Sequence, residues 1–183
     1  MPTTKNNTLT VGLASLASLV LMAVPGDAAP RDNKNKPGEK REMLSLHKTV
    51  AKFSGVASRR CMGLTTLCPD NCGHSGEFAT FDIIAYLAYE KPGQYGDPKA
   101  ESYMFQIEDN RKKLKVASEL AQQVRELKQG DFVLLDWQHD YVTKTDGGGS
   151  VSSPERTVTK LQKITKDEAD ALTRKAASQP SRP

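Results

Sequence analysis

The most informative feature of this sequence is what it contains little of. Its 183 residues include only three Cys, three His and one Trp. No glycine-rich phosphate-binding loop, nucleophile elbow or pair of carboxylates stands out, and each of these motifs serves a large class of enzymes. The sequence therefore favours a non-enzymatic role and assigns no catalytic residue.

Apolar residues and net charge are also modest. Hydrophobic residues make up 37% of the chain and charged residues 26%. The apolar deficit lies mostly in the terminal segments, so a single small domain with polar tails is expected. The formal net charge is +4, from 26 basic and 22 acidic residues, without a basic stripe. A general nucleic-acid binder has a stronger basic bias, so nucleic acid is not the expected partner.

Only one stretch is long and apolar enough to enter a membrane, and it lies near the N-terminus. Lys5 precedes an apolar run from Leu9 to Val24, and the small residues of Gly26-Asp27-Ala28 follow it. This order is typical of a secretory signal peptide, so we expect residues 1–28 to be removed and the protein to be exported to the periplasm or the cell exterior. The alternative is a membrane anchor, but the run of about 16 residues is shorter than the ~20 that span a bilayer.

The rest of the chain divides into three parts by composition. Residues 29–46 are rich in charged residues, Asn and Pro, and are expected to form a polar linker. Residues 47–165 have the apolar patterning of a folded, strand-rich domain. Residues 166–183 are a polar tail, at whose start Thr165 and Glu168 form a capping box that predicts a short helix.

Five segments of the domain have the apolar content of β-strands, and loops rich in Gly, Pro and Asp separate them. A bulge is expected in the first of them at Gly55. The expected strands are Thr49–Arg60, Glu77–Tyr89, Ser102–Ile107, Asp131–Val142 and Arg156–Ile164.

One helix is expected between the third and fourth strands. Its apolar residues recur at i, i+4, i+8 and i+11, which places them on one face, and Gly130 is positioned to end it in left-handed geometry. Three strands, one helix and two strands is the element order of the OB-fold, a small five-stranded Greek-key barrel. We therefore expect a mainly β protein with this barrel, and a β-sandwich with one helix is the alternative. The residues of the helix stripe are Val116, Leu120, Val124 and Leu127.

The residues best suited to chemistry gather in the loop after the first strand. Cys61, Cys68 and Cys72 have the spacing C-x6-C-x3-C, and His74 follows two residues later. Thiolate and imidazole are the ligands that Zn²⁺ and Cu⁺ prefer, so the loop is a candidate metal site. His139 is a second candidate for the imidazole ligand, because pairing of the first and fourth strands in an OB barrel could bring it towards Cys61.

Two other interpretations of the cluster stay open. In an oxidising compartment two of the Cys residues would form a disulfide and leave one thiol over. A thiol enzyme would need a Cys of low pKa beside a His, but nothing in the sequence marks an oxyanion hole. The spacing lacks the paired C-x2-C knuckles of zinc ribbons, so it does not decide between a metal and a disulfide.

Two aromatic residues, Trp137 and Tyr141, flank His139 near the end of the fourth strand. OB barrels stack ligands on such side chains, so this pair is the candidate ligand-binding face. The alternative is that both pack in the core or along an edge of the sheet, as most aromatic residues of a small domain do.

The segments Cys61–Gly76 and Trp137–Val142 resemble motifs of uncharacterised exported bacterial proteins with an OB-like domain and a Cys/His-rich loop. The resemblance spans most of residues 49–164, and it implies the fold and the export route but no functional residue. We expect an exported module that binds a ligand or a protein partner, with Zn or Cu as the candidate cofactor of the loop. A metal- or thiol-dependent redox protein and a structural envelope protein are the alternatives.

Overall fold

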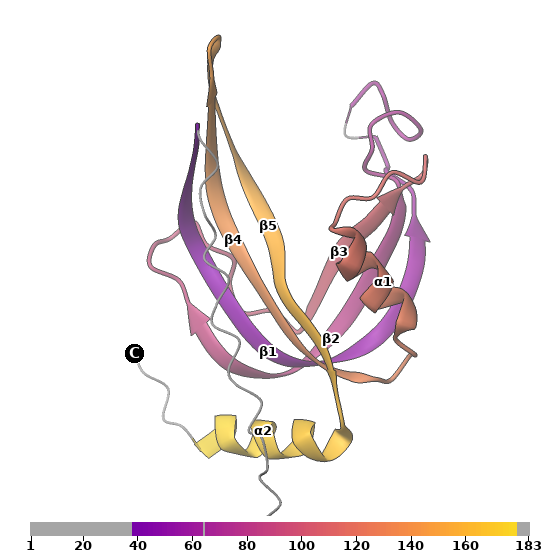
Figure 1. The fold of residues 1–183 in the computed structure, drawn as a ribbon, viewed down its shortest axis with the longest axis vertical. Helices are drawn as coiled ribbons and strands as arrows, with labels where there is room; N and C mark the ends of the chain where they lie inside the picture. The colour runs from indigo at the N-terminus through magenta and orange to yellow at the C-terminus, as the bar shows by residue number, and fades with distance from the viewer. Residues whose placement is uncertain (1–37, 64, 179–183) are drawn as a thin grey trace, which may run out of the picture. The chain divides into compact units, whose positions relative to one another are not determined.

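The structure is a computed structural model that describes residues 38–63 and 65–178. Its centre is one antiparallel sheet of five strands, accompanied in the described residues by two helices (Figure 1). The mainly β class expected from the sequence is therefore confirmed. In chain order the elements are β1 (Glu39–Arg59), β2 (Gly76–Glu90), β3 (Ser102–Asp109), α1 (Ser118–Glu126), β4 (Phe132–Asp146), β5 (Gly149–Ile164) and α2 (Lys166–Ser178).

The longest strand, β1, lies in the middle of the sheet, whose order is β3-β2-β1-β4-β5. It pairs antiparallel with β2 on one side and with β4 on the other. The expected pairing of the first and fourth strands is thus confirmed, and so is the bulge at Gly55, where the register with β2 shifts. In chain order α1 lies between β3 and β4, where the apolar stripe predicts a helix.

The expected closure of the sheet into a barrel is wrong. The end strands β3 and β5 pair only with β2 and β4 respectively, and not with each other. The sheet is strongly curved (Figure 1), and α1 places Ala121 and Val124 in the same apolar core as Phe81 and Leu135. A helix packed on the sheet supplies the cover that closure between strands would otherwise supply. Element order along the chain is the same in both cases and does not distinguish them.

A stack of three rings joins β1, β3 and β4 within this core. The Trp137 ring lies parallel to the His47 ring at 4.3 Å between centroids and to the Tyr103 ring at 4.1 Å. Trp137 is 2% exposed, and His47 is completely buried. Stacked aromatic pairs contribute about 0.5–1.5 kcal/mol beyond the burial of their apolar area. The stack therefore stabilises the curved arrangement of strands that are far apart in the sequence.

The N-terminal part of β1 lies in the segment expected to be a linker. β1 begins at Glu39, so residues 39–46 belong to the sheet. The Arg41 guanidinium donates hydrogen bonds to the carboxylates of Asp140 at 3.3 Å and Glu155 at 3.0 Å. Charged side chains are stable in strands when they have partners on neighbouring strands, so composition alone misplaces this boundary.

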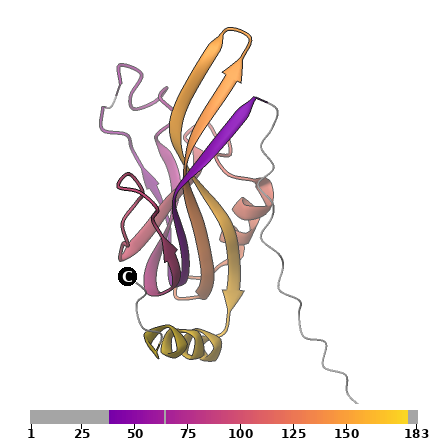
Figure 2. The same ribbon diagram turned by 90° about the vertical axis from the view of Figure 1, so that its left-hand side faces the viewer.

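The hairpin formed by β4 and β5 is longer than the sequence predicts. The expected strands end at Val142 and begin again at Arg156, but the pairing continues to Asp146 and Gly149, which a tight turn joins. The hydroxyls of Thr143 and Ser152 lie 2.9 Å apart across the hairpin. Figure 2 shows this hairpin extending beside the N-terminal end of β1. Near this turn the strands consist mostly of exposed polar residues, so apolar alternation cannot reveal this part of the hairpin.

The C-terminal end of α1 does not lie where the sequence predicts it. α1 ends at Glu126, and Leu127 already has extended backbone geometry. Gly130 does have a positive φ of +94°, but it lies in the turn after the helix, where its amide donates to the carbonyl of Phe53 at 2.8 Å. The role of Gly130 as the residue that ends the helix is therefore wrong, because its left-handed geometry serves the turn into β4.

The capping box at the start of α2 is confirmed. The Glu168 carboxylate accepts a hydrogen bond from the amide of Thr165 at 2.8 Å, and the Thr165 hydroxyl accepts one from the amide of Glu168 at 3.3 Å. The helix buries Ala169 and continues to Ser178.

The expected signal peptide, residues 1–28, lies outside the described residues, as do residues 29–37. Within the part of the chain that the structure describes, neither helix has the length and apolar character needed to cross a bilayer. The exported location therefore stays a prediction from the sequence.

Candidate metal centre in the Cys-rich loop

The loop with the three Cys residues connects the end of β1 to the start of β2 (Figure 1). The pairing of Arg59 with Gly76 closes its base. Ser75, which is 5% exposed, ties the two sides together: its hydroxyl accepts from the amide of Cys61 at 2.9 Å and donates to the carbonyl of Pro69 at 2.6 Å. The beginning and the end of the loop are therefore held side by side.

Three soft donor atoms converge at this base. The sulfur atoms of Cys61 and Cys72 and a ring nitrogen of His74 all lie within 4.8 Å of one another. Tetrahedral zinc with bonds of about 2.3 Å to sulfur and 2.0 Å to nitrogen places neighbouring donors roughly 3.3–3.8 Å apart. Small side-chain movements would therefore bring the three donors into coordination distance of one ion. The two thiols are partly buried, whereas His74 is exposed.

Cys68 lies beside this group without belonging to it. Its Sγ is 3.0 Å from the Sγ of Cys61, and it accepts a hydrogen bond from the amide of Thr65 at 3.3 Å. The contact with Cys61 and then the hydrogen bonds from Thr65 lower the pKa of Cys68 to about 6. Such a thiol is largely a thiolate at neutral pH, which is the form that reacts in thiol–disulfide exchange.

Cys72 and His74 are linked by the backbone between them. The amide of His74 donates a hydrogen bond to the Sγ of Cys72 at 3.5 Å. This bond favours the thiolate, but burial and the nearby thiols of Cys68 and Cys61 outweigh it, so the pKa of Cys72 is raised. Gly73 between them has a φ of +73°, a conformation that glycine adopts without strain. Backbone donors of this kind orient metal-binding side chains.

The turn after β3 supports the loop from outside. The Asn110 side chain donates to the carbonyl of Asp70 at 3.0 Å. The Lys115 ammonium lies 3.2 Å from the carboxylate of Asp109 and borders Gly73, where an added Cβ would lie 3.1 Å from its Nζ. The turn after β3 therefore lies directly against the Cys-rich loop.

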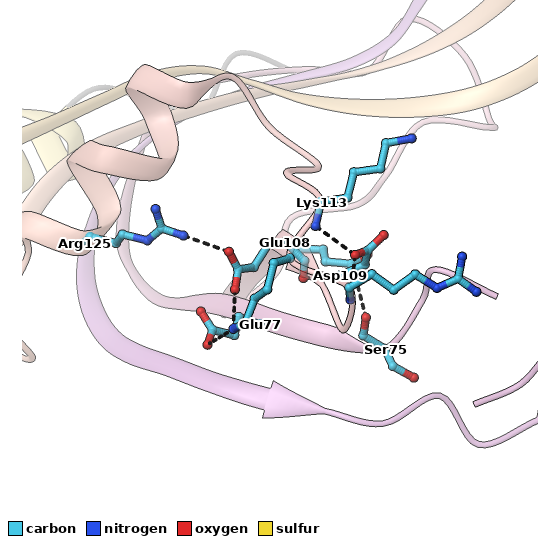
Figure 3. Close-up of polar contacts among 9 residues, drawn as sticks. Ser75, Glu77, Glu108, Asp109, Lys113 and Arg125 are labelled. Carbon is cyan, nitrogen blue, oxygen red and sulfur yellow. Dashed lines mark hydrogen bonds and ion pairs between the residues drawn. The ribbon is translucent and has the colours of Figure 1, made fainter. Parts of the chain in front are cut away.

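Two buried carboxylates hold this turn in place (Figure 3). Glu108, 5% exposed, accepts from Arg125 of α1 at 2.9 Å and from Lys112 at 2.7 Å. Asp109 accepts from the amide of Lys113 at 3.0 Å, and this bond, with further help from Lys115, keeps the pKa of Asp109 below its usual value. Because these partners satisfy both carboxylates, we assign them a structural role behind the loop.

The structure places His139 far along the sheet from the Cys-rich loop. In the β1–β4 pairing His139 lies opposite Ser45, in the N-terminal half of β1, whereas Cys61 follows the C-terminal end of that strand. The expected approach of His139 to Cys61 is therefore wrong. Pairing of two strands does not determine which residues meet, because the antiparallel register decides this.

The expectation that Trp137 forms part of a ligand-binding face is also wrong, whereas the role expected for Tyr141 stays a prediction. Trp137 lies between the rings of His47 and Tyr103, so neither of its faces is free for a ligand. Tyr141 is 43% exposed and lies further along β4. The alternative of core packing applies to Trp137, because the curvature of the sheet turns this position towards the interior.

A polar cluster lies beside the ring stack, and no sequence motif marks it. Asp97 accepts two hydrogen bonds of 2.7 Å from Arg156. The Asp97 carboxylate also lies 3.2 Å from Nδ1 of His139, which is ion-pair distance without hydrogen-bond geometry. These residues come from the β2–β3 connection, β5 and β4. No short-range pattern links them, and only the fold brings them together.

His47 and His139 are buried, and ring nitrogens of both lack a hydrogen-bond partner among the described residues. Nε2 of His47 lies 3.0 Å from the hydroxyl of Ser45, but its Nδ1 has no partner in the described residues. Burial lowers the pKa of both His47 and His139, and it outweighs the opposite effect of the Asp97 carboxylate. The alternation of Ser45, His47 and Thr49 is the only sequence signal of this buried polar face.

Comparisons with family models, with curated proteins and with solved structures find no match to this chain. Function is therefore inferred from the geometry of the described residues. Among these, the convergent group of metal-binding donors is Cys61, Cys72 and His74.

Proposed function

We propose that this protein is an exported, non-enzymatic binding module that holds a soft metal ion, Zn²⁺ or Cu⁺, in its Cys-rich loop. The observation that carries this proposal is the convergence of the Cys61, Cys72 and His74 donors within 4.8 Å. Two thiolates and an imidazole suit both ions, whereas Mg²⁺ and Ca²⁺ prefer oxygen donors. Export is supported by the signal-like composition of residues 1–28.

The number of protein ligands leaves the site with an open position. Catalytic metal sites share this arrangement, so a metal-dependent redox protein is the second candidate function. A tetrahedral ion held by three side chains retains one position for a water molecule or an external donor. His74 is exposed and the thiols are partly buried, so the ion would lie at the loop surface. We therefore assign the fourth position to a small donor ligand or to a side chain of a partner protein.

The position of the site determines how metal binding couples to folding. All three ligands come from the β1–β2 loop, whereas the apolar core consists of strand residues and α1. The Ser75 hydrogen bonds hold the base of the loop without an ion. Metal should therefore order the loop and leave the sheet folded when removed, unlike small zinc domains that unfold without their ion.

Metal content and affinity of the purified mature protein test this proposal. We expect about one equivalent of zinc or copper per chain in elemental analysis, as for a single tetrahedral site. His74→Gln should weaken zinc binding by roughly 100-fold in competition with a chromophoric chelator, since one ligand is lost. His139→Gln is the matched control and should bind zinc like the wild type. Absence of metal binding in the wild type, or equal affinities of both variants, would contradict the proposal.

A further inference from the structure

Cys61 is the one thiol that takes part in two alternative arrangements. With Cys72 and His74 it forms the group of convergent metal donors. With Cys68 it forms a sulfur pair at 3.0 Å. A disulfide bond is about 2.05 Å long, so the two sulfur atoms need to approach by only about 1 Å to become bonded.

The local backbone holds Cys68 against Cys61. The amide of Cys68 donates to the carbonyl of Thr65 at 3.1 Å, which closes a turn. The amide of Thr65 in turn donates to the Cys68 sulfur at 3.3 Å, and the amide of Cys61 is bound to Ser75. These bonds preorganise the sulfur pair, and they do not involve His74 or Cys72.

We infer that Cys61 and Cys68 form a reversible disulfide and that its formation releases the metal ion, so that the loop binds metal only in its reduced state. This inference rests on the proposed metal-binding function and adds regulation of metal binding by oxidation. Oxidation removes the Cys61 thiolate and leaves two of the three convergent donors, Cys72 and His74. Two ligands hold a zinc ion far more weakly than three, and a disulfide sulfur is no substitute for a thiolate.

The oxidant is a small-molecule disulfide, such as those present in an oxidising compartment. One thiolate of the pair attacks a sulfur of this molecule, forms a mixed disulfide and releases the first small thiolate. The second Cys then attacks the mixed disulfide, forms the Cys61–Cys68 bond and releases the second small thiolate, which takes up the proton lost by the protein thiol. The protein pair gives up two electrons, and the small disulfide accepts them.

The inference assigns different roles to Cys68 and Cys72, and this makes it testable with two single variants. Cys68→Ser removes the redox partner and leaves the donors Cys61, Cys72 and His74 in place. Cys72→Ser removes a metal ligand and leaves the sulfur pair in place. The substitutions are chemically identical and lie in the same loop, so each variant is the control for the other.

The experiment loads the mature protein with zinc, adds oxidised glutathione in steps and follows released zinc with a chromophoric chelator. The wild type should release its zinc, and peptide mass analysis should find the Cys61–Cys68 disulfide; dithiothreitol should restore binding. Cys68→Ser should bind zinc within about threefold of the wild type and retain most of it at the same oxidant concentration. Cys72→Ser should bind zinc roughly 100-fold more weakly, as expected for a lost ligand, yet form the disulfide.

The outcomes separate failure of this inference from failure of the proposed function. If the wild type binds zinc but keeps it during oxidation, or if Cys68→Ser loses binding, the inference is overturned while the metal-binding function stands. If no protein binds zinc and the Cys61–Cys68 disulfide still forms, the metal-binding function fails, and metal release fails with it. Circular dichroism of each variant checks that the sheet remains folded.

Discussion

His74 and His139 are the same residue type in opposite environments. His74 is exposed in a loop, and its ring nitrogen converges with the sulfur atoms of Cys61 and Cys72. His139 is 4% exposed within β4, where its Nδ1 lies 3.2 Å from the Asp97 carboxylate. The difference shows that an imidazole becomes available to a metal where a short loop places soft donors beside it. Inside the sheet it contributes to packing, and its titration affects stability.

If the buried environment of His139 stabilises the sheet and the exposed loop of His74 does not, the largest change in the free energy of unfolding is expected in the ring stack beside His139. Trp137→Ala should reduce the free energy of unfolding by about 3–5 kcal/mol, because it removes a large buried ring between His47 and Tyr103. Tyr141→Ala, the control on the same strand, should change it by about 0.5 kcal/mol or less, as is usual at exposed positions. Urea unfolding measures both. Similar midpoints for the two variants would show that the stack does not stabilise the sheet.

Metal should affect stability less than the ring stack does. Free zinc at 100 times its dissociation constant should raise the free energy of unfolding by about 2.7 kcal/mol, provided that the unfolded chain does not bind the ion. At the same zinc concentration Cys72→Ser, with roughly 100-fold weaker binding, should reduce this gain to about 0.4 kcal/mol. Protein treated with EDTA should keep its far-ultraviolet dichroism and a cooperative melt. Loss of the sheet on treatment with EDTA would instead make the metal part of the fold.

Acidification should destabilise the sheet through the buried His residues. Burial lowers the pKa of His139 in the folded state, with a further contribution from Arg156, and the carboxylates of Asp97 and Asp140 oppose this. The unfolded chain then binds a proton first as the pH falls below about 6.5, so stability is complete above that pH and decreases below it. The loss is about 1.4 kcal/mol for each unit by which the pKa is lowered.

Urea unfolding of metal-free protein between pH 7.5 and pH 5 tests this dependence. His139→Gln should reduce the slope, because the replacement side chain does not titrate in this range, while buried His47 keeps its own contribution. An unchanged slope in His139→Gln would show that burial of His139 does not cause the pH dependence.

The smallest effect on the free energy of unfolding is expected for Arg156, at the exposed side of the polar cluster with Asp97 and His139. Arg156 is about half exposed, so Arg156→Met should cost about 1 kcal/mol or less despite its paired hydrogen bonds to Asp97. The same change removes a cation and leaves Asp97 facing His139, so the pKa of His139 should rise. Nuclear magnetic resonance titration of the imidazole protons measures this. Lys163→Met, which removes the ion pair with Asp131, should leave His139 unaffected.

Local sequence signals predicted much of the secondary structure and part of the site. The capping box of Thr165 and Glu168 and the bulge at Gly55 depend only on residues close in sequence. The cluster of Cys61, Cys72 and His74 was also accessible, because one loop carries all three. Apolar alternation did not reveal the start of β1 at Glu39, since its polar side chains are stabilised by ion pairs with the β4–β5 hairpin.

Local patterns along the chain specify the mainly β class, the chain order of strands and helix, and the short loop that concentrates thiols and an imidazole. These properties follow from propensity, turn chemistry and spacing, which act over a few residues. Only the tertiary structure decided that the sheet stays open, that Trp137 is buried, and that His74 rather than His139 joins the thiols. It also decided that Asp97 and Arg156 meet beside His139. Each of these depends on strand register and on packing between residues far apart in the chain, which no local pattern specifies.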